Sequence, residues 1–127
     1  MSASTHLHIG RADGEQPDFD EVTRSLAIEW DEKRPNGYHR GYPEGATRQN
    51  ERVLWGSPQL NDDEEDAEMV KAWPLTIEND DRDSANRLRW SRAAFEKLRE
   101  AGGYAVALED DTLGELDRFP AGVGPAL

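Results

Sequence analysis

The chain has no cysteine and no stretch of even ten consecutive apolar residues. Without cysteine there is neither a disulfide framework nor a thiolate metal site. The covalent and metal cross-links that usually stabilise small secreted domains are therefore excluded. The first 30 residues lack the basic start and the apolar stretch of a secretory signal peptide. No segment is apolar enough to span a bilayer. We therefore expect a soluble protein that is not secreted by a signal peptide and has no membrane partner.

Large apolar side chains are also scarce, because Leu, Ile, Val and Phe make up only 22 of the 127 residues. This share lies below the roughly 20% under which a highly charged chain is suspected of disorder. Four tryptophans are expected to supplement the core, because each buries a large area. They are Trp30, Trp55, Trp73 and Trp90. The length allows a single domain over residues 1–127, with a thin core and long irregular segments.

Acidic residues greatly outnumber basic ones, with 27 Asp and Glu against 15 Lys and Arg and a net charge of -12. Only three of the basic residues are lysine, which a genome rich in G and C explains, but the acid excess has another cause. In molar salt the screening length falls to about 3 Å, so that self-repulsion largely vanishes. The composition favours a halophilic system: a high-salt cytoplasm, or a virus particle assembled in one. Direct binding of nucleic acid is not expected, because it depends on clustered Lys and Arg.

The order of apolar and turn-forming segments predicts an α+β fold with a small, mostly antiparallel sheet of four or five short strands and one main helix. Ser91 is expected to cap this helix, over about 92–101, with Trp90 and Phe95 as a hydrophobic staple. We divide the chain into an N-terminal arm with a strand (1–20), a loop rich in Gly, Pro, Arg and Tyr (34–50), the best-ordered core (51–111) and an extended C-terminal arm (114–127).

The loop is too long and too poor in aliphatic residues to form core, yet the segment from Arg34 to Arg52 contains four arginines, which we interpret as the only local basic excess in the sequence. Tyr and Arg are the residues that dominate interface energetics. We therefore predict that the loop contacts another subunit, through Tyr38, Arg40, Tyr42 and Arg48. An ordinary surface loop is the alternative.

Few residues suggest chemistry. His6 and His8 are two apart, so on a strand they share one face and have a spacing that metal ligands permit, but no third ligand can be singled out. No serine lies in the turn that activates a nucleophile. We expect no metal and no cofactor, and two partly exposed histidines.

One stretch suggests an enzyme. The sequence RLRWSRAAFEKLREAGGYAVAL follows the order strand, serine-capped helix, Gly-Gly, apolar strand. Over residues 53–111 the chain resembles the PD-(D/E)XK restriction-endonuclease-like fold. The resemblance implies a Mg²⁺-dependent nuclease, in which acids hold the ion and a lysine stabilises charge. Two placements of the incomplete signature exist: Glu68 with Lys71, where Met69 stands in the acid's position, or Asp18 and Asp31 with Lys33.

We interpret the sequence as that of a non-enzymatic structural or interaction protein of a halophilic system, most concretely a subunit of a virus particle or another multi-subunit assembly. Its partners are expected to be other protein subunits, copies of itself included. A nuclease that requires Mg²⁺ and an acidic regulator that binds a basic surface are the alternatives.

Overall fold

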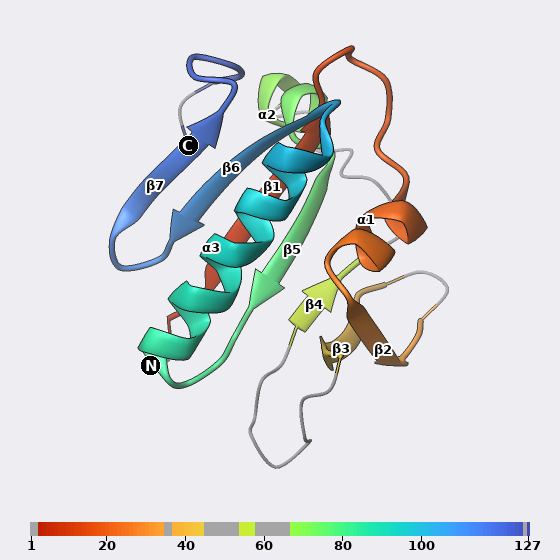
Figure 1. The fold of residues 1–127 in the computed structure, drawn as a ribbon, viewed down its shortest axis with the longest axis vertical. Coiled ribbons are helices and arrows are strands. Elements are labelled where there is room, and N and C mark those ends of the chain that lie inside the picture. The colour runs from red at the N-terminus through yellow and green to blue at the C-terminus, as the bar shows by residue number, and fades with distance from the viewer. Residues whose placement is uncertain (1–2, 35–36, 45–53, 58–66, 126) are drawn as a thin grey trace.

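The computed structural model describes residues 3–34, 37–44, 54–57, 67–125 and 127. Within these ranges the chain forms one antiparallel sheet of seven strands and three helices (Figure 1). The strands are β1 (Thr5–Arg11), β2 (Ile28–Glu32), β3 (His39–Pro43), β4 (Leu54–Gly56), β5 (Leu75–Asn79), β6 (Tyr104–Asp110) and β7 (Gly114–Phe119), and the helices are α1 (Phe19–Ser25), α2 (Ala67–Ala72) and α3 (Ser84–Ala101). None of these helices combines the length and apolarity needed to cross a bilayer.

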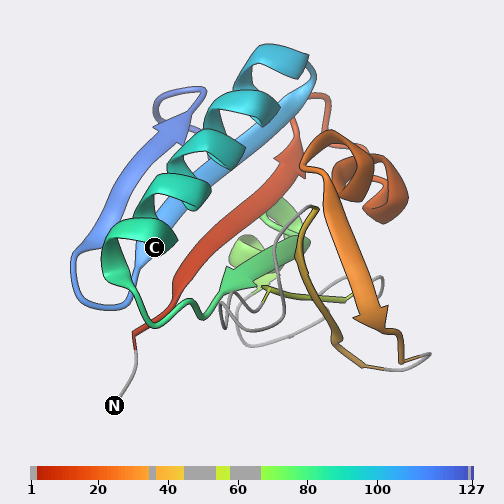
Figure 2. The same ribbon diagram turned by 60° about the horizontal axis from the view of Figure 1, so that its bottom comes forward.

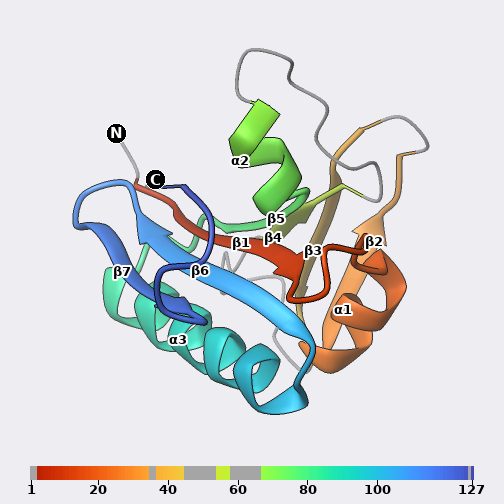
Figure 3. The same ribbon diagram turned by 90° about the horizontal axis from the view of Figure 1, so that it is seen from above.

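The strand order is β2-β3-β4-β5-β1-β6-β7, so β1 lies between β5 and β6 and pairs antiparallel with both. Helix α3 connects β5 to β6 and therefore crosses over β1. Helices α3 and α1 lie on one face of the sheet and α2 on the other (Figure 3). The strands β7 and β2 form the two edges, on opposite sides of the molecule (Figure 2).

The predicted α+β class and antiparallel sheet are confirmed, but four or five strands were too few. The strand β3 lies inside the segment assigned to a loop, and β7 lies inside the segment assigned to an extended arm. Gly and Pro argue against regular structure locally. Here they are compatible with strands because neighbouring strands supply the hydrogen bonds and the close packing.

Strand alternation separates the two faces. In β1, Leu7 and Ile9 are buried against the helices, whereas His6 and His8 point to the opposite face and are partly exposed. The main core lies on the first face. Its buried residues are Leu7, Ile9, Phe19, Val22, Leu26, Ile28, Leu54, Leu75, Ile77, Ala94, Phe95, Leu98, Tyr104, Val106 and Leu108. A second, small core on the other face contains Trp73 against β6.

Two glycines let an indole ring lie flat across the sheet. A Cβ on Gly41 would lie 2.7 Å from Cε3 of Trp30, and one on Gly56 would lie 2.9 Å from its Cη2. Trp30 also stacks on Phe19, with ring centroids 5.5 Å apart, and its Nε1 donates a hydrogen bond of 3.0 Å to Thr23. Gly41 in β3 and Gly56 in β4 thus make room for the indole ring of Trp30.

The C-terminal segment is folded back onto the second face. The guanidinium of Arg118 lies 5.8 Å from the ring centroid of Trp73 and donates to the main-chain oxygens of Gly124 and Pro125, each at 3.0 Å. The expected extended arm is therefore wrong for the described part of 114–127, because one β7 side chain satisfies the carbonyls that follow it.

A buried ion pair joins α3 to the sheet. Arg87 is 5% exposed and Asp110 is 1% exposed, and Nη2 of Arg87 lies 3.2 Å from Oδ1 of Asp110. The same guanidinium donates through Nε to Thr5 Oγ1 at 2.9 Å and through Nη1 to the Asp81 carbonyl at 3.2 Å. One side chain thus connects α3, β1, β6 and the turn that follows β5.

Asp110 is held in its charged form. Burial by itself would raise its pKa, but the hydrogen bonds from Thr5, from the amides of Thr112 and Leu113 and from Arg87 together lower it. Because the pKa of the folded state is the lower one, this group stabilises the fold at neutral pH and loses that contribution as the pH falls through the folded-state pKa.

The main helix begins earlier than predicted. Asp83, and not Ser91, is the N-cap, since its carboxylate accepts from the amides of Ala85 and Asn86 at 3.0 and 3.2 Å. Arg87 and Ser91 are one turn apart and both face the sheet. RLRW suggested a strand because polar and apolar side chains alternate in it, but Arg87 is buried in the helix, where Asp110, Thr5 and the Asp81 carbonyl pair with its guanidinium.

Truncation at these two positions should have unequal effects. Asp83→Ala should lower the free energy of unfolding by about 1 kcal/mol, because two helix N–H groups lose their acceptor. Ser91→Ala should leave it unchanged or raise it slightly, because Ser91 Oγ is buried without a hydrogen-bond partner in the described structure. Urea unfolding measures both, and a loss at Ser91 equal to that at Asp83 would restore Ser91 as the cap.

Arg87→Met should lower the free energy of unfolding by about 3 kcal/mol or more, because it leaves the buried carboxylate of Asp110 without its ion-pair partner. Arg92→Gln is the matched control, since Arg92 pairs with Asp117 on the surface at 2.7 Å. The control should lose less than about 1 kcal/mol. Equal losses of unfolding free energy in the two variants would show that the buried ion pair contributes no more to stability than the surface pair.

Candidate functional site

The residues predicted to form an interface lie in different surroundings. Tyr38 is 54% exposed, as expected for a docking residue. Tyr42 is only 8% exposed and lies within β3, where it pairs with Glu29. Arg40 lies on the same strand, with its guanidinium 5.9 Å from the Tyr42 ring centroid and 3.6 Å from a Glu32 oxygen. The expectation that Tyr42 lies outside the core is wrong, and Arg48 lies outside the described residues.

The residues of the nuclease resemblance come from three separate elements. Asp18 is the N-cap of α1, where its carboxylate accepts from the amides of Asp20 and Glu21. Asp31 lies on the edge strand β2, with Lys33 just beyond it. The other pair, Glu68 and Lys71, lies on α2. Helix α2 precedes Pro74 and β5 follows it, so Lys71 does not lie on a strand.

A polar cluster occupies the second face at one end of β1. His6 Nε2 lies 2.8 Å from Asp111 Oδ1, and its Nδ1 lies 3.6 Å from Glu78 Oε1. Beside it, His8 Nε2 lies 3.0 Å from Glu109 Oε1. Both histidines thus meet carboxylates. Among the residues with described positions, no group of three His, Asp or Glu side chains is arranged to hold a metal ion.

Burial sets the protonation of this face. It raises the pKa of Glu78, and repulsion by Asp80 raises it further. It also lowers the pKa of His8, and Glu109 opposes this shift without cancelling it. The face therefore holds a carboxylate that is costly to ionise and a histidine that favours its neutral form.

A second candidate site lies on α3. The helix contains five basic and two acidic residues in a chain of net charge -12. Its excess of basic residues is therefore larger than that of the loop at 34–50, where the local basic excess was expected. Counting charges along the helix would have found it, but the prediction began the helix too late. The exposed basic residues are Arg89, Arg92, Lys97 and Arg99. They give the outside of α3 the opposite charge to the molecule as a whole.

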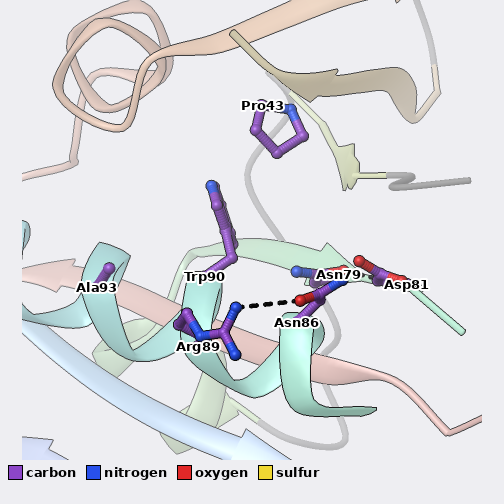
Figure 4. A pocket seen from close by; sticks show the side chains of 7 residues that line it. All are labelled: Pro43, Asn79, Asp81, Asn86, Arg89, Trp90 and Ala93. Atoms are coloured by element: carbon purple, nitrogen blue, oxygen red, sulfur yellow. Dashed lines mark hydrogen bonds between the residues drawn. The ribbon is translucent and has the colours of Figure 1, made fainter. Parts of the chain in front are cut away.

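Beside this helix is a hollow of about 240 Å³, lined by residues of α3, β3, β5 and the turn after β5. The lining consists of Pro43, Asn79, Asp81, Asn86, Arg89, Trp90 and Ala93 (Figure 4). The indole of Trp90 rises from α3 toward Pro43, and the guanidinium of Arg89 points toward Asn86. The hollow thus combines an aromatic wall with a cation, two carboxamides and the carboxylate of Asp81.

Comparison of the chain with protein-family models, curated proteins and solved structures gives no match. The resemblance to the PD-(D/E)XK fold accordingly stays a prediction.

Glu78→Gln should raise the free energy of unfolding at pH 7, by less than about 1 kcal/mol because the side chain is partly exposed. The folded-state pKa lies above the ordinary 4.5, so ionisation of Glu78 costs stability as the pH rises through that pKa. The gain should disappear at acid pH, where Glu78 is protonated. Glu109→Gln is the control and should give no gain. Urea unfolding at several pH values checks this, and a loss at Glu78 at neutral pH would contradict it.

Proposed function

We propose that this protein is a non-enzymatic interaction subunit of a multi-subunit assembly in a halophilic system, most concretely a component of a virus particle. The observation that carries the proposal is the separation of charge. The outside of α3 is basic and bears a hollow beside Trp90, whereas the chain as a whole carries -12. A subunit with surfaces of both signs can bind acidic neighbours, further copies of itself among them.

High salt is part of this proposal. In dilute buffer, the net charge of -12 keeps copies apart. In molar salt the screening length is about 3 Å, so long-range repulsion fades and only groups in contact interact. Association then depends on contact pairs and buried apolar area, both of which the hollow beside α3 offers.

The way the other ionisable groups are used supports a structural role. Asp18 and Asp83 cap helices, Asp110 receives Arg87, and Arg118 holds the C-terminal segment. Each of these side chains has a partner within the fold.

A nuclease remains the alternative function. DNA cleavage that requires Mg²⁺ and is lost in Lys33→Ala or Lys71→Ala, but not in the control Lys97→Ala, would replace the proposal.

Two measurements on the wild-type chain test the proposal. The melting temperature should rise as KCl increases from ~0.1 M to ~3 M, because repulsion among the carboxylates is screened. In the higher salt, sedimentation over about 1 to 100 μM should show a mass that grows above that of the 14.3 kDa monomer. A flat or falling melting temperature would contradict the halophilic origin, and a monomer at every concentration would contradict self-association.

A further inference from the structure

The arginines on the outside of α3 are not equivalent. Arg92 Nη1 lies 2.7 Å from Asp117, and Arg99 Nη2 lies 3.1 Å from Glu96. Arg89, by contrast, donates to the neutral carboxamide oxygen of Asn86 at 3.2 Å. Within the described part of the chain, Arg89 has no carboxylate at ion-pair distance. An arginine that lacks an acidic partner is unexpected in a protein with 27 acidic residues.

The contact with Asn86 orients the guanidinium but uses one of its five N–H donors. The remaining donors can bind a carboxylate in the bidentate geometry that suits arginine. Asn86 lies one turn before Arg89 on α3 and also lines the hollow, so the guanidinium is positioned at its rim.

The rest of the hollow suits an apolar side chain. Trp90 provides an aromatic wall, and Pro43 and Ala93 provide aliphatic surface. Lys97 follows Trp90 by seven residues, two helical turns, so it lies on the same side of α3. It is exposed and has no carboxylate partner among the described residues. Lys97 thus adds a second cation on this side of the helix, beyond the residues that line the hollow.

One carboxylate also lines the hollow, but it is engaged in the turn. Asp81 is 4% exposed, and its Oδ1 accepts from the amide of Asp83 at 3.0 Å. Its main-chain oxygen accepts from Arg87 at 3.2 Å. The exposed charge at the hollow is therefore that of Arg89.

We propose that the hollow beside Trp90 binds an acidic segment of a partner subunit, in which a carboxylate stands next to an apolar side chain. The carboxylate contacts Arg89, and the apolar side chain packs between Trp90, Pro43 and Ala93. This inference rests on the proposed function and names the chemistry of the partner. Because the guanidinium and the carboxylate are in contact, the interaction persists in molar salt, where attraction at longer range is screened.

The probe is a fluorescein-labelled short peptide of alternating glutamate and leucine, and its control has glutamine in place of glutamate. Binding to the full chain is measured by fluorescence anisotropy at ~0.1 M and ~2 M KCl. The glutamate peptide should bind at both salt concentrations. The affinity of the glutamine peptide should be lower by at least about tenfold.

Variants locate the site. Arg89→Gln should weaken binding by about tenfold or more, whereas Arg92→Gln, on the same helix but already paired with Asp117, should change it by less than about twofold. Circular dichroism confirms that both variants fold. In ¹⁵N spectra, the indole N–H signal assigned to Trp90 by the Trp90→Phe variant should shift when the peptide is added.

Four results would overturn the inference: no binding at millimolar peptide, equal binding of the glutamine peptide, equal loss in the two arginine variants, or binding that disappears in ~2 M KCl as diffuse attraction does. Sedimentation distinguishes a failure of the peptide-binding site from a failure of the proposed function. Self-association of the wild type without peptide binding would overturn the site alone. Loss of self-association in Arg89→Gln but not in Arg92→Gln would support the site, with a second copy as the partner.

Discussion

The buried pair of Arg87 and Asp110 is the contact on which the arrangement of helix and sheet depends. Two charges removed from water are stable only if their remaining hydrogen-bonding groups are satisfied, and here Thr5 and the Asp81 carbonyl complete the set. These partners come from the first strand, the sixth strand and the turn before the helix. The pair therefore fixes the start of α3 over β1, and with it the position of Trp90 above the hollow.

The sheet separates two environments that differ in polarity. One face buries the main aliphatic and aromatic core beneath α1 and α3. The other carries His6, His8 and their carboxylate partners, together with a small cluster around Trp73. A chain poor in large apolar residues can build only one substantial core, so the second face is covered by histidine–carboxylate contacts, by α2 and by the returning C-terminal segment.

Charge is distributed just as unevenly as polarity. Most arginines of known position either support the fold, as Arg87 and Arg118 do, or meet a carboxylate on the surface, as Arg92 does. Arg89 differs because it meets only an amide. In molar salt, charge at a distance has little effect, so an interface must rely on contact geometry. For the formation of an interface in molar salt, an arginine beside an aromatic side chain therefore matters more than the net charge of the chain.

The sequence alone determined the properties that add up residue by residue: the acidic balance, the lack of disulfides, the α+β class and the end of the main helix at Ala101. It did not reveal that Tyr42 lies in a buried strand, that Ser91 lies in mid-helix or that Arg87 is core. The burial of Arg87 depends on Asp110 and Thr5, and the packing of the glycine-containing strands β3 and β4 depends on Trp30, all of them partners outside the local segment. Local patterns report the preference of a segment, whereas burial of a charge or a glycine-rich strand is decided by what packs against it, and only the tertiary structure brings those partners together.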